Sequence, residues 1–310
     1  MRTLVGIDGQ EHYRSALDLL SRLEFEDNRL TLVHVDPLVT DYGIYPVVPM
    51  VLNEVEIEEA ITEAAKGLLK TASLAAKGSG LGDVETVYAT GSSSATIMRM
   101  ADERHDDLVA IGARPHGALE SFFLGSVGRA LAIGGHQSFL VARGVLKTHG
   151  PMRALFATDG SDYADRCFAR LLAMDPRGIA HVSVVTAMES NKRYVIDARR
   201  SDVERAEEAA FGGSTQTATL SDVEDIERIK GDEMVRRLVA SGRTADFRFV
   251  EGTPAAALGK AMIDTESDLM ILGASGHGLI SRVFIGSLAL HVVVSESYPV
   301  LVMRMTEAGK

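Results

Sequence analysis

The chain has 310 residues, of which 46% are hydrophobic and 24% charged, and its formal net charge is −11. This composition is typical of a globular protein of about two domains, and the acidic balance argues against a general surface for nucleic acid or anionic membrane. The single cysteine, Cys167, excludes an internal disulfide and favours a reducing compartment, with the thiol as a small buried residue rather than a reactive one.

At the start of the chain, MRTLVGIDGQ contains too short an apolar run for a secretory signal. No later stretch approaches the ~20 apolar residues that a transmembrane helix requires. We therefore expect a cytoplasmic protein without a membrane span.

Short apolar runs then alternate with helical patterns along the chain. In the first half we predict strands at 3–8, 30–35, 83–89, 107–112 and 138–143, and helices at 11–23, 55–79, 93–104 and 126–134. After a boundary near 144–153, we predict strands at 153–159, 180–187, 246–251, 268–273 and 299–304. Apolar strands such as LVAIG and LMILG suit a parallel sheet covered on both faces, so each half should be a doubly wound α/β unit.

In each half, one insertion follows the second strand. Residues 37–50 mix proline with apolar residues and are interpreted as a loop or lid. Residues 189–220 are charged and then rich in Gly, Ser and Thr, which favours a solvated helix and a flexible loop over a dedicated interaction tail.

The two halves repeat one another. TLVGIDG near the start matches ALFATDG, YATGSSSATI matches FVEGTPAAAL, and GARPHGALESFFLGS (112–126) matches GASGHGLISRVFIGS (273–287). Such self-similarity predicts two tandem modules, which we place at 1–146 (module 1) and 152–310 (module 2).

In an open parallel sheet, ligands bind beyond the carboxyl ends of strands near the point where strand order reverses. Module 2 brings two segments there: an Asp-Gly turn, Thr158 to Ser161, and a glycine-rich stretch ending at Gly286-Ser287. A carboxylate accepts hydrogen bonds from a ribose, glycines let main-chain N–H groups approach phosphates, and a helix N-terminus favours anions. Together they predict an adenosine-phosphate site without a phosphate-binding lysine, although Asp159 taken alone fits a capped turn better than a ligand contact.

The pattern Gly273-x-x-Gly276-x9-Gly286-Ser287 after DLMILG resembles the nucleotide-binding motif of the universal stress protein family. The resemblance covers essentially the whole chain, as two modules. It implies a five-stranded parallel sheet of order 3-2-1-4-5 in each module. In that family the last strands pair across a two-fold interface, so QSFLVAR and YPVLVMR are expected to pair within this chain and mimic a homodimer.

The resemblance also implies a set of ligand-binding residues. In module 2 these are Thr158, Asp159, Ala187, Leu272, Gly273, Gly276, His277, Gly286, Ser287 and Leu288, with Asp159 beside the adenosine and the last glycines around the phosphates. His277 is either a phosphate contact or a solvent-facing loop residue. The weaker set of module 1 is Asp8, Val35, Gly112, Gly125, Ser126 and Val127.

Module 1 has Pro115 where module 2 has Gly276. Proline lacks an N–H group and fixes φ, so it removes one donor to a phosphate. The loss of one charge-assisted hydrogen bond costs about 1.5–3 kcal/mol. We therefore predict an unequal pair, in which module 2 binds ATP and module 1 is degenerate with weak or altered binding; the alternative is that both sites fill.

These features predict a nucleotide-dependent regulatory module of a stress response, with Mg²⁺ held mainly by ATP oxygens and water. Its protein partner is unknown, and further association into a homodimer is left open. The alternatives are a slow ATPase or adenylyl- or phosphoryl-transfer enzyme, and a scaffold without nucleotide. The sequence has no P-loop, no G-x-S-x-G elbow and no zinc-type cluster, so nothing in it assembles a nucleophile with a base.

Overall fold

The structure, a computed structural model, describes residues 1–37, 54–116, 121–144, 150–188, 220–275 and 285–305. The expected insertions at 37–50 and 189–220 lie almost wholly outside the described residues. The elements of module 1 are β1 (Arg2–Gly6), α1 (Tyr13–Leu23), β2 (Arg29–Asp36), α2 (Glu54–Gly78), β3 (Asp83–Thr90), α3 (Ser93–Glu103), β4 (Leu108–Gly112), β5 (Arg114–His116), β6 (Ser121–Phe123), α4 (Ser126–Gly134) and β7 (Ser138–Ala142).

In its described residues, module 2 repeats this order of elements apart from β5 and β6. They are β8 (Met152–Ala157), α5 (Asp162–Met174), β9 (Ile179–Met188), α7 (Leu220–Ala240), β10 (Thr244–Glu251), α8 (Pro254–Asp264), β11 (Leu269–Gly273), α9 (Ser287–Ser295) and β12 (Val300–Met303). The predicted strands of both halves agree with these bounds to within about two residues. The α/β class and the tandem organisation of the fold are therefore confirmed.

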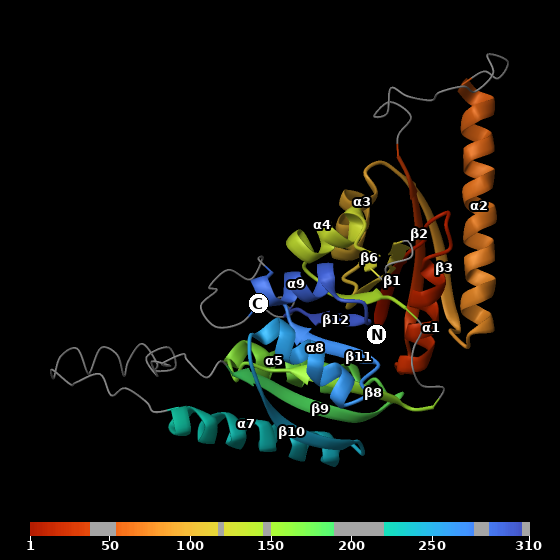
Figure 1. Cartoon of the computed structure of the whole chain (residues 1–310). Coiled ribbons are helices and arrows are strands. Elements are labelled where there is room, and N and C mark those ends of the chain that lie inside the picture. Colours follow the sequence, from red (N-terminus) through yellow and green to blue (C-terminus); the bar gives the residue numbers. More distant parts are fainter. Residues whose placement is uncertain (38–53, 117–120, 145–149, 189–219, 276–284, 306–310) are drawn as a thin grey trace, which may run out of the picture.

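The main sheet has ten strands in the order β10-β9-β8-β11-β12-β7-β4-β1-β2-β3. Counted within each module, this is the expected order 3-2-1-4-5. The arrangement differs from two separate five-stranded sheets, because β7 and β12 pair and make the sheet continuous (Figure 1). Every other neighbouring pair in this sheet is parallel, and only β7 and β12 run antiparallel.

The joint between the modules is apolar. Leu140 lies opposite Leu301 and Val141 opposite Val300, and all four side chains are buried. An apolar strand edge exposes unpaired backbone groups and tends to associate. The pairing of the last strands expected from the sequence removes two such edges within one chain.

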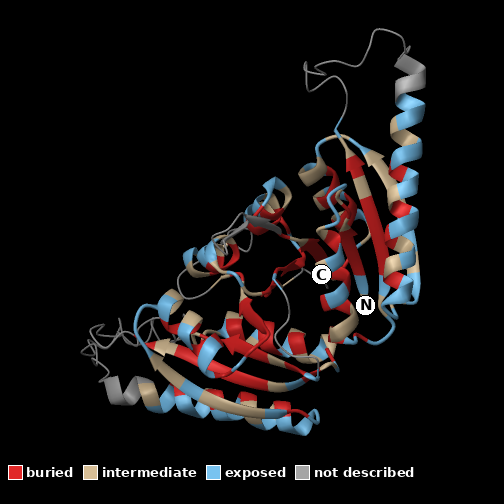
Figure 2. Cartoon of the chain, turned by 45° about the vertical axis from the view of Figure 1, so that its right-hand side comes forward, coloured by how far each residue is buried: buried red, intermediate tan, exposed pale blue. Residues whose placement is uncertain are grey.

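Helices cover both faces of the sheet. Helices α1, α2, α5 and α7 pack on one face, and α3, α4, α8 and α9 pack on the other. Figure 2 shows buried strands between helices whose outer surfaces are exposed. Each of the two cores contains side chains from both modules, so the hydrophobic interior runs across the joint. Among the described residues, no helix is both long enough and apolar enough to cross a membrane.

The short hairpin of β5 and β6 was not predicted. In it Pro115 lies opposite Phe122, in a two-stranded sheet apart from the main one. An edge strand tolerates a proline because not every N–H group there must donate. The backbone of β6 also contacts α9 of module 2. The loop of module 1 that carries proline therefore adopts a hairpin next to the other module.

Candidate functional site

A cavity of about 640 Å³ opens at the carboxyl ends of β1, β2 and β4 in module 1. This volume falls within the range of small-molecule pockets. The residues predicted for module 1 all contribute to its lining: Asp8, Val35, Gly112, Gly125, Ser126 and Val127. The structure thus brings together four separate segments of the sequence.

Asp8 is held at one wall of this cavity by the start of α1. One carboxylate oxygen pairs with Nδ1 of His12, and the other accepts a hydrogen bond from the N–H of Tyr13 at 3.3 Å. The Asp8 side chain remains 43% exposed. The carboxylate is therefore oriented by α1 and still accessible from the cavity.

Helix α4 supplies the opposite wall. Gly125 precedes the helix and Ser126 begins it. The first N–H groups of a helix have no acceptor within it, and those of Ser126, Val127 and Gly128 donate to no other group in the described part of the chain. These donors and the positive end of the helix dipole make this wall suitable for an anion.

A second histidine, His34, lines the cavity and was not predicted from the sequence. Nδ1 of His34 lies 2.8 Å from the carbonyl oxygen of Ile7, and Nε2 lies 3.2 Å from Oδ1 of Asp36. The neighbouring carbonyl of Val35, one of the predicted positions, accepts a hydrogen bond from the hydroxyl of Ser93 at 3.3 Å. These contacts depend on the register between β1 and β2, which no sequence motif encodes.

In module 2 the Asp-Gly turn follows β8. Oγ1 of Thr158 accepts from the N–H of Gly160 at 3.0 Å, and Oδ1 of Asp159 accepts from the N–H and hydroxyl of Ser161 at 3.0 and 2.6 Å. Gly160 has φ of +66°, a region that favours glycine. Asp159 therefore stabilises the turn, one of the two roles open from the sequence, and its contact with a ligand stays a prediction.

Helix α7 packs against this turn. Nζ of Lys230 donates to the carbonyl of Gly160 at 2.5 Å. The Glu227 carboxylate is close enough that a Cβ at Gly160 would lie 2.0 Å from Oε2. Sequence reasoning did not identify Lys230 or Glu227, because α7 follows the long insertion and no motif sets how it meets the turn.

The other described positions of module 2 occupy the equivalent elements. Ala187 lies near the end of β9, half-buried, and the buried Leu272 packs in the core beside α8 and α9. Gly273 ends β11, Gly286 precedes α9, and Ser287 and Leu288 begin that helix. The N–H of Gly286 donates to the carbonyl of Ala274 at 2.7 Å, which fixes the start of α9 against the end of β11. Gly276 and His277 lie outside the described residues.

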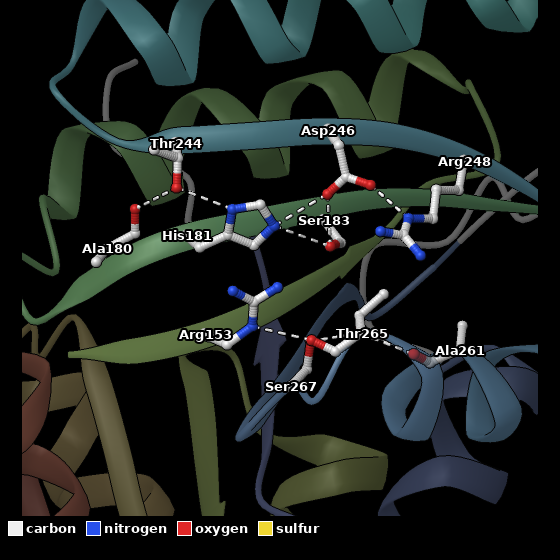
Figure 3. Close-up of polar contacts among 10 residues, drawn as sticks. All are labelled: Arg153, Ala180, His181, Ser183, Thr244, Asp246, Arg248, Ala261, Thr265 and Ser267. Atoms are coloured by element: carbon white, nitrogen blue, oxygen red, sulfur yellow. Dashed lines mark hydrogen bonds and ion pairs between the residues drawn. The ribbon is translucent and has the colours of Figure 1, made fainter. Parts of the chain in front are cut away.

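A serine, a histidine and an aspartate meet on the sheet of module 2, as Figure 3 shows. Nε2 of His181 lies 2.9 Å from Oδ1 of Asp246 and 3.2 Å from Oγ of Ser183. The Ser183 hydroxyl donates to the same aspartate oxygen at 2.8 Å and is fully buried. In a catalytic triad the serine donates to the histidine, which the acid orients from its other nitrogen. This arrangement is instead a structural polar network.

Burial would raise the pKa of Asp246, but hydrogen bonds from Arg248, Ser183 and His181 outweigh it and hold this pKa below its usual value. The network therefore keeps the aspartate ionised. Cys167, by contrast, is fully buried, and burial raises the pKa of its thiol to about 12. The expected burial of this cysteine is confirmed.

Within the described ranges, no three His, Cys, Asp or Glu side chains converge as metal ligands would. The donors at the α4 wall of the module 1 cavity are main-chain N–H groups and the hydroxyl of Ser126, which suit phosphate oxygens. If Mg²⁺ accompanies a nucleotide here, the nucleotide must carry it, and this stays a prediction.

Comparison with known proteins places these observations in a family. The model of the universal stress protein family matches residues 1–143 and again 151–304. The universal stress protein in QAH/OAS sulfhydrylase 3'region of Thermus aquaticus is 29% identical over 150 residues, covering 48% of this chain and 96% of that protein. The universal stress protein YxiE of Bacillus subtilis is 29% identical over 130 residues, covering 41% and 87%.

Two solved structures match along nearly the whole chain. The crystal structure of a universal stress protein from Archaeoglobus fulgidus aligns with a TM-score of 0.64 at 17% identity and covers 98% of each chain. The functionally unknown protein PA1789 from Pseudomonas aeruginosa aligns with a TM-score of 0.54 at 15% identity, covering 97% of this chain and 92% of its own. At these identities the structures show the shared fold alone.

Proposed function

We propose that this chain, which belongs to the universal stress protein family, is an adenine-nucleotide-binding regulatory protein in which module 2 holds ATP. The observation that supports nucleotide binding is the cavity of module 1, where six predicted positions line a space of small-molecule size, and we carry it to module 2 through the repeat. The same elements of module 2 carry Asp159, Gly273, Gly286 and Ser287. Module 2 also keeps glycine at 276, where module 1 has Pro115.

The chemistry of the site favours binding over turnover. Phosphoryl transfer requires a positioned nucleophile and compensation of the charge on the leaving phosphate. The donors in the described parts of the two sites are mostly main-chain N–H groups and hydroxyls. We infer that ATP acts as a ligand whose presence changes the association of the chain with a regulatory partner.

The first prediction concerns how much nucleotide the chain carries. The protein is purified without added nucleotide and denatured, and the released adenine nucleotide is quantified per chain. We expect about one ATP per chain. About two would contradict the unequal pair, and none would support the scaffold alternative. Mostly ADP, together with steady turnover of added ATP, would support the enzyme.

A matched pair of variants assigns the site. Gly276→Pro should abolish this occupancy while the circular dichroism spectrum stays that of the wild type, because proline removes a donor from the proposed phosphate loop. Pro115→Gly makes the reverse change in module 1 and should leave the nucleotide of module 2 in place. If Gly276→Pro retains full occupancy, ATP is bound elsewhere.

A further inference from the structure

Each module ends in a strand followed by a buried arginine. Arg143 follows β7 and is 2% exposed, and its guanidinium donates to the carbonyls of Val293 and Glu296. These carbonyls lie at the C-terminus of α9, which belongs to module 2. The last arginine of module 1 therefore caps a helix of the other module.

The same contact occurs in the opposite direction. Arg304 follows β12 of module 2, is 3% exposed, and donates to the carbonyl of Ala132 near the end of α4 in module 1. Its guanidinium also lies 5.6 Å from the ring centroid of Phe139 on β7. Ala132 and Val293 correspond to each other in the repeat, as the two arginines do. The contact is thus reciprocal across the joint.

Burying a guanidinium is costly unless it gains strong partners. Burial lowers the pKa of Arg143 to about 10 and also lowers the pKa of Arg304. In the described part of the chain both groups donate to main-chain carbonyls and form no ion pair with a carboxylate, and Nε of each is buried without a partner. The cationic charge is thereby placed at the negative end of a helix dipole, where it is favourable.

The helices that receive these arginines are the ones that begin at the candidate phosphate positions. Helix α4 starts at Ser126 and α9 at Ser287, and each has nine residues. A helix of this length spans only about 13 Å, so its two ends move together. Helices α4 and α9 contact each other near the joint of the sheet (Figure 1).

We propose that Arg143 and Arg304 are positioning residues, through which each module fixes the anion-binding helix of the other. This inference rests on the proposed function. It predicts that the phosphate affinity of one module depends on an arginine of its neighbour.

The test is a crossed pair of variants, measured by calorimetric titration with MgATP after removal of bound nucleotide. Arg143→Met lies in module 1 but should weaken binding at module 2 about tenfold, through loss of the cap on α9. Arg304→Met lies in module 2 itself but should leave that affinity within about twofold. Arg143→Lys keeps a cation at the end of α9 and should recover most of the affinity.

Hydrogen exchange gives a readout that does not depend on the nucleotide. In Arg143→Met the amides of α9 should exchange faster while those of α4 do not, and Arg304→Met should give the opposite pattern. If the wild-type chain binds no MgATP, the proposed function fails, and the exchange pattern still decides the role of the arginines. Equal effects of both variants on module 2, or faster exchange in both helices alike, would contradict the proposal and show that the arginines act only through general packing. If a methionine variant does not fold, Arg143→Gln and Arg304→Gln, which remove the charge but keep a polar side chain, carry the same comparison.

Discussion

At the scale of single residues, Asp106 is an unusual buried acid. It is 3% exposed just before β4, and Nε of Arg104 lies 3.9 Å from its Oδ2. Burial raises the pKa of Asp106 to about 6, although the charges of Arg104 and Arg2 oppose the shift. The folded state therefore holds this proton more tightly than the unfolded state, so the contribution of Asp106 to stability falls as the pH rises from about 4 to about 6.

Asp106→Asn should remove that loss. A shift of two pKa units corresponds to about 3 kcal/mol. The free energy of unfolding of the variant minus that of the wild type should therefore be higher at pH 7 than at pH 4, by up to that amount. Urea denaturation at both pH values measures it. In module 2 the position equivalent to Asp106 is Ser267, whose hydroxyl forms a hydrogen bond of 2.7 Å with that of Thr265 (Figure 3). Asp106→Ser therefore serves as a matched control. An equal difference at the two pH values would contradict the prediction.

At the scale of elements, the two modules differ in how closely a strand end approaches a helix start. A Cβ at Gly112 would lie 1.8 Å from the carbonyl oxygen of His12, whereas one at Gly273 would lie 3.1 Å from a ring carbon of Tyr163. Backbone must move in the first case, but a side chain can adjust in the second. We expect Gly112→Ala to lower the free energy of unfolding by about 3 kcal/mol or more and Gly273→Ala by about 1 kcal/mol. Guanidinium denaturation of the nucleotide-free protein measures both, and the reverse order would refute this account.

Elements with local signals could be predicted from the sequence, and contacts between elements could not. The buried strands were found because a parallel sheet covered on both faces requires apolar runs such as the one at Leu108–Gly112. The module 1 cavity was found through the resemblance. The hairpin at Arg114–His116 has strands too short to show a pattern. Contacts of His34 and Arg143 depend on which strand or helix lies opposite, and this is a tertiary property.

At the scale of the whole molecule, the modules share their interior. Each core contains side chains of both modules, and outside the sheet the N–H of Gly178 donates to the carbonyl of Leu23 at 3.1 Å across the joint. We therefore expect one cooperative unfolding transition, with calorimetric and van't Hoff enthalpies equal. Differential scanning calorimetry measures this.

Leu140→Lys, which places a charge opposite Leu301 at the centre of the joint, should split that transition in two. Ile263→Lys is the control, since that side chain is 68% exposed on α8 and its replacement should leave a single transition. Two well-separated transitions in the wild-type chain would show that the modules unfold independently.

The antiparallel pairing of β7 with β12 has one more consequence. Both strands belong to a single polypeptide, so their effective concentration is set by the covalent link between the two modules and not by the number of molecules in solution. Two separate one-module chains would come apart on dilution, and the contact of each arginine with the opposite helix would be lost with them. In the fused chain that contact persists at any abundance, so the response to nucleotide that we propose would not depend on how many copies of the protein are present.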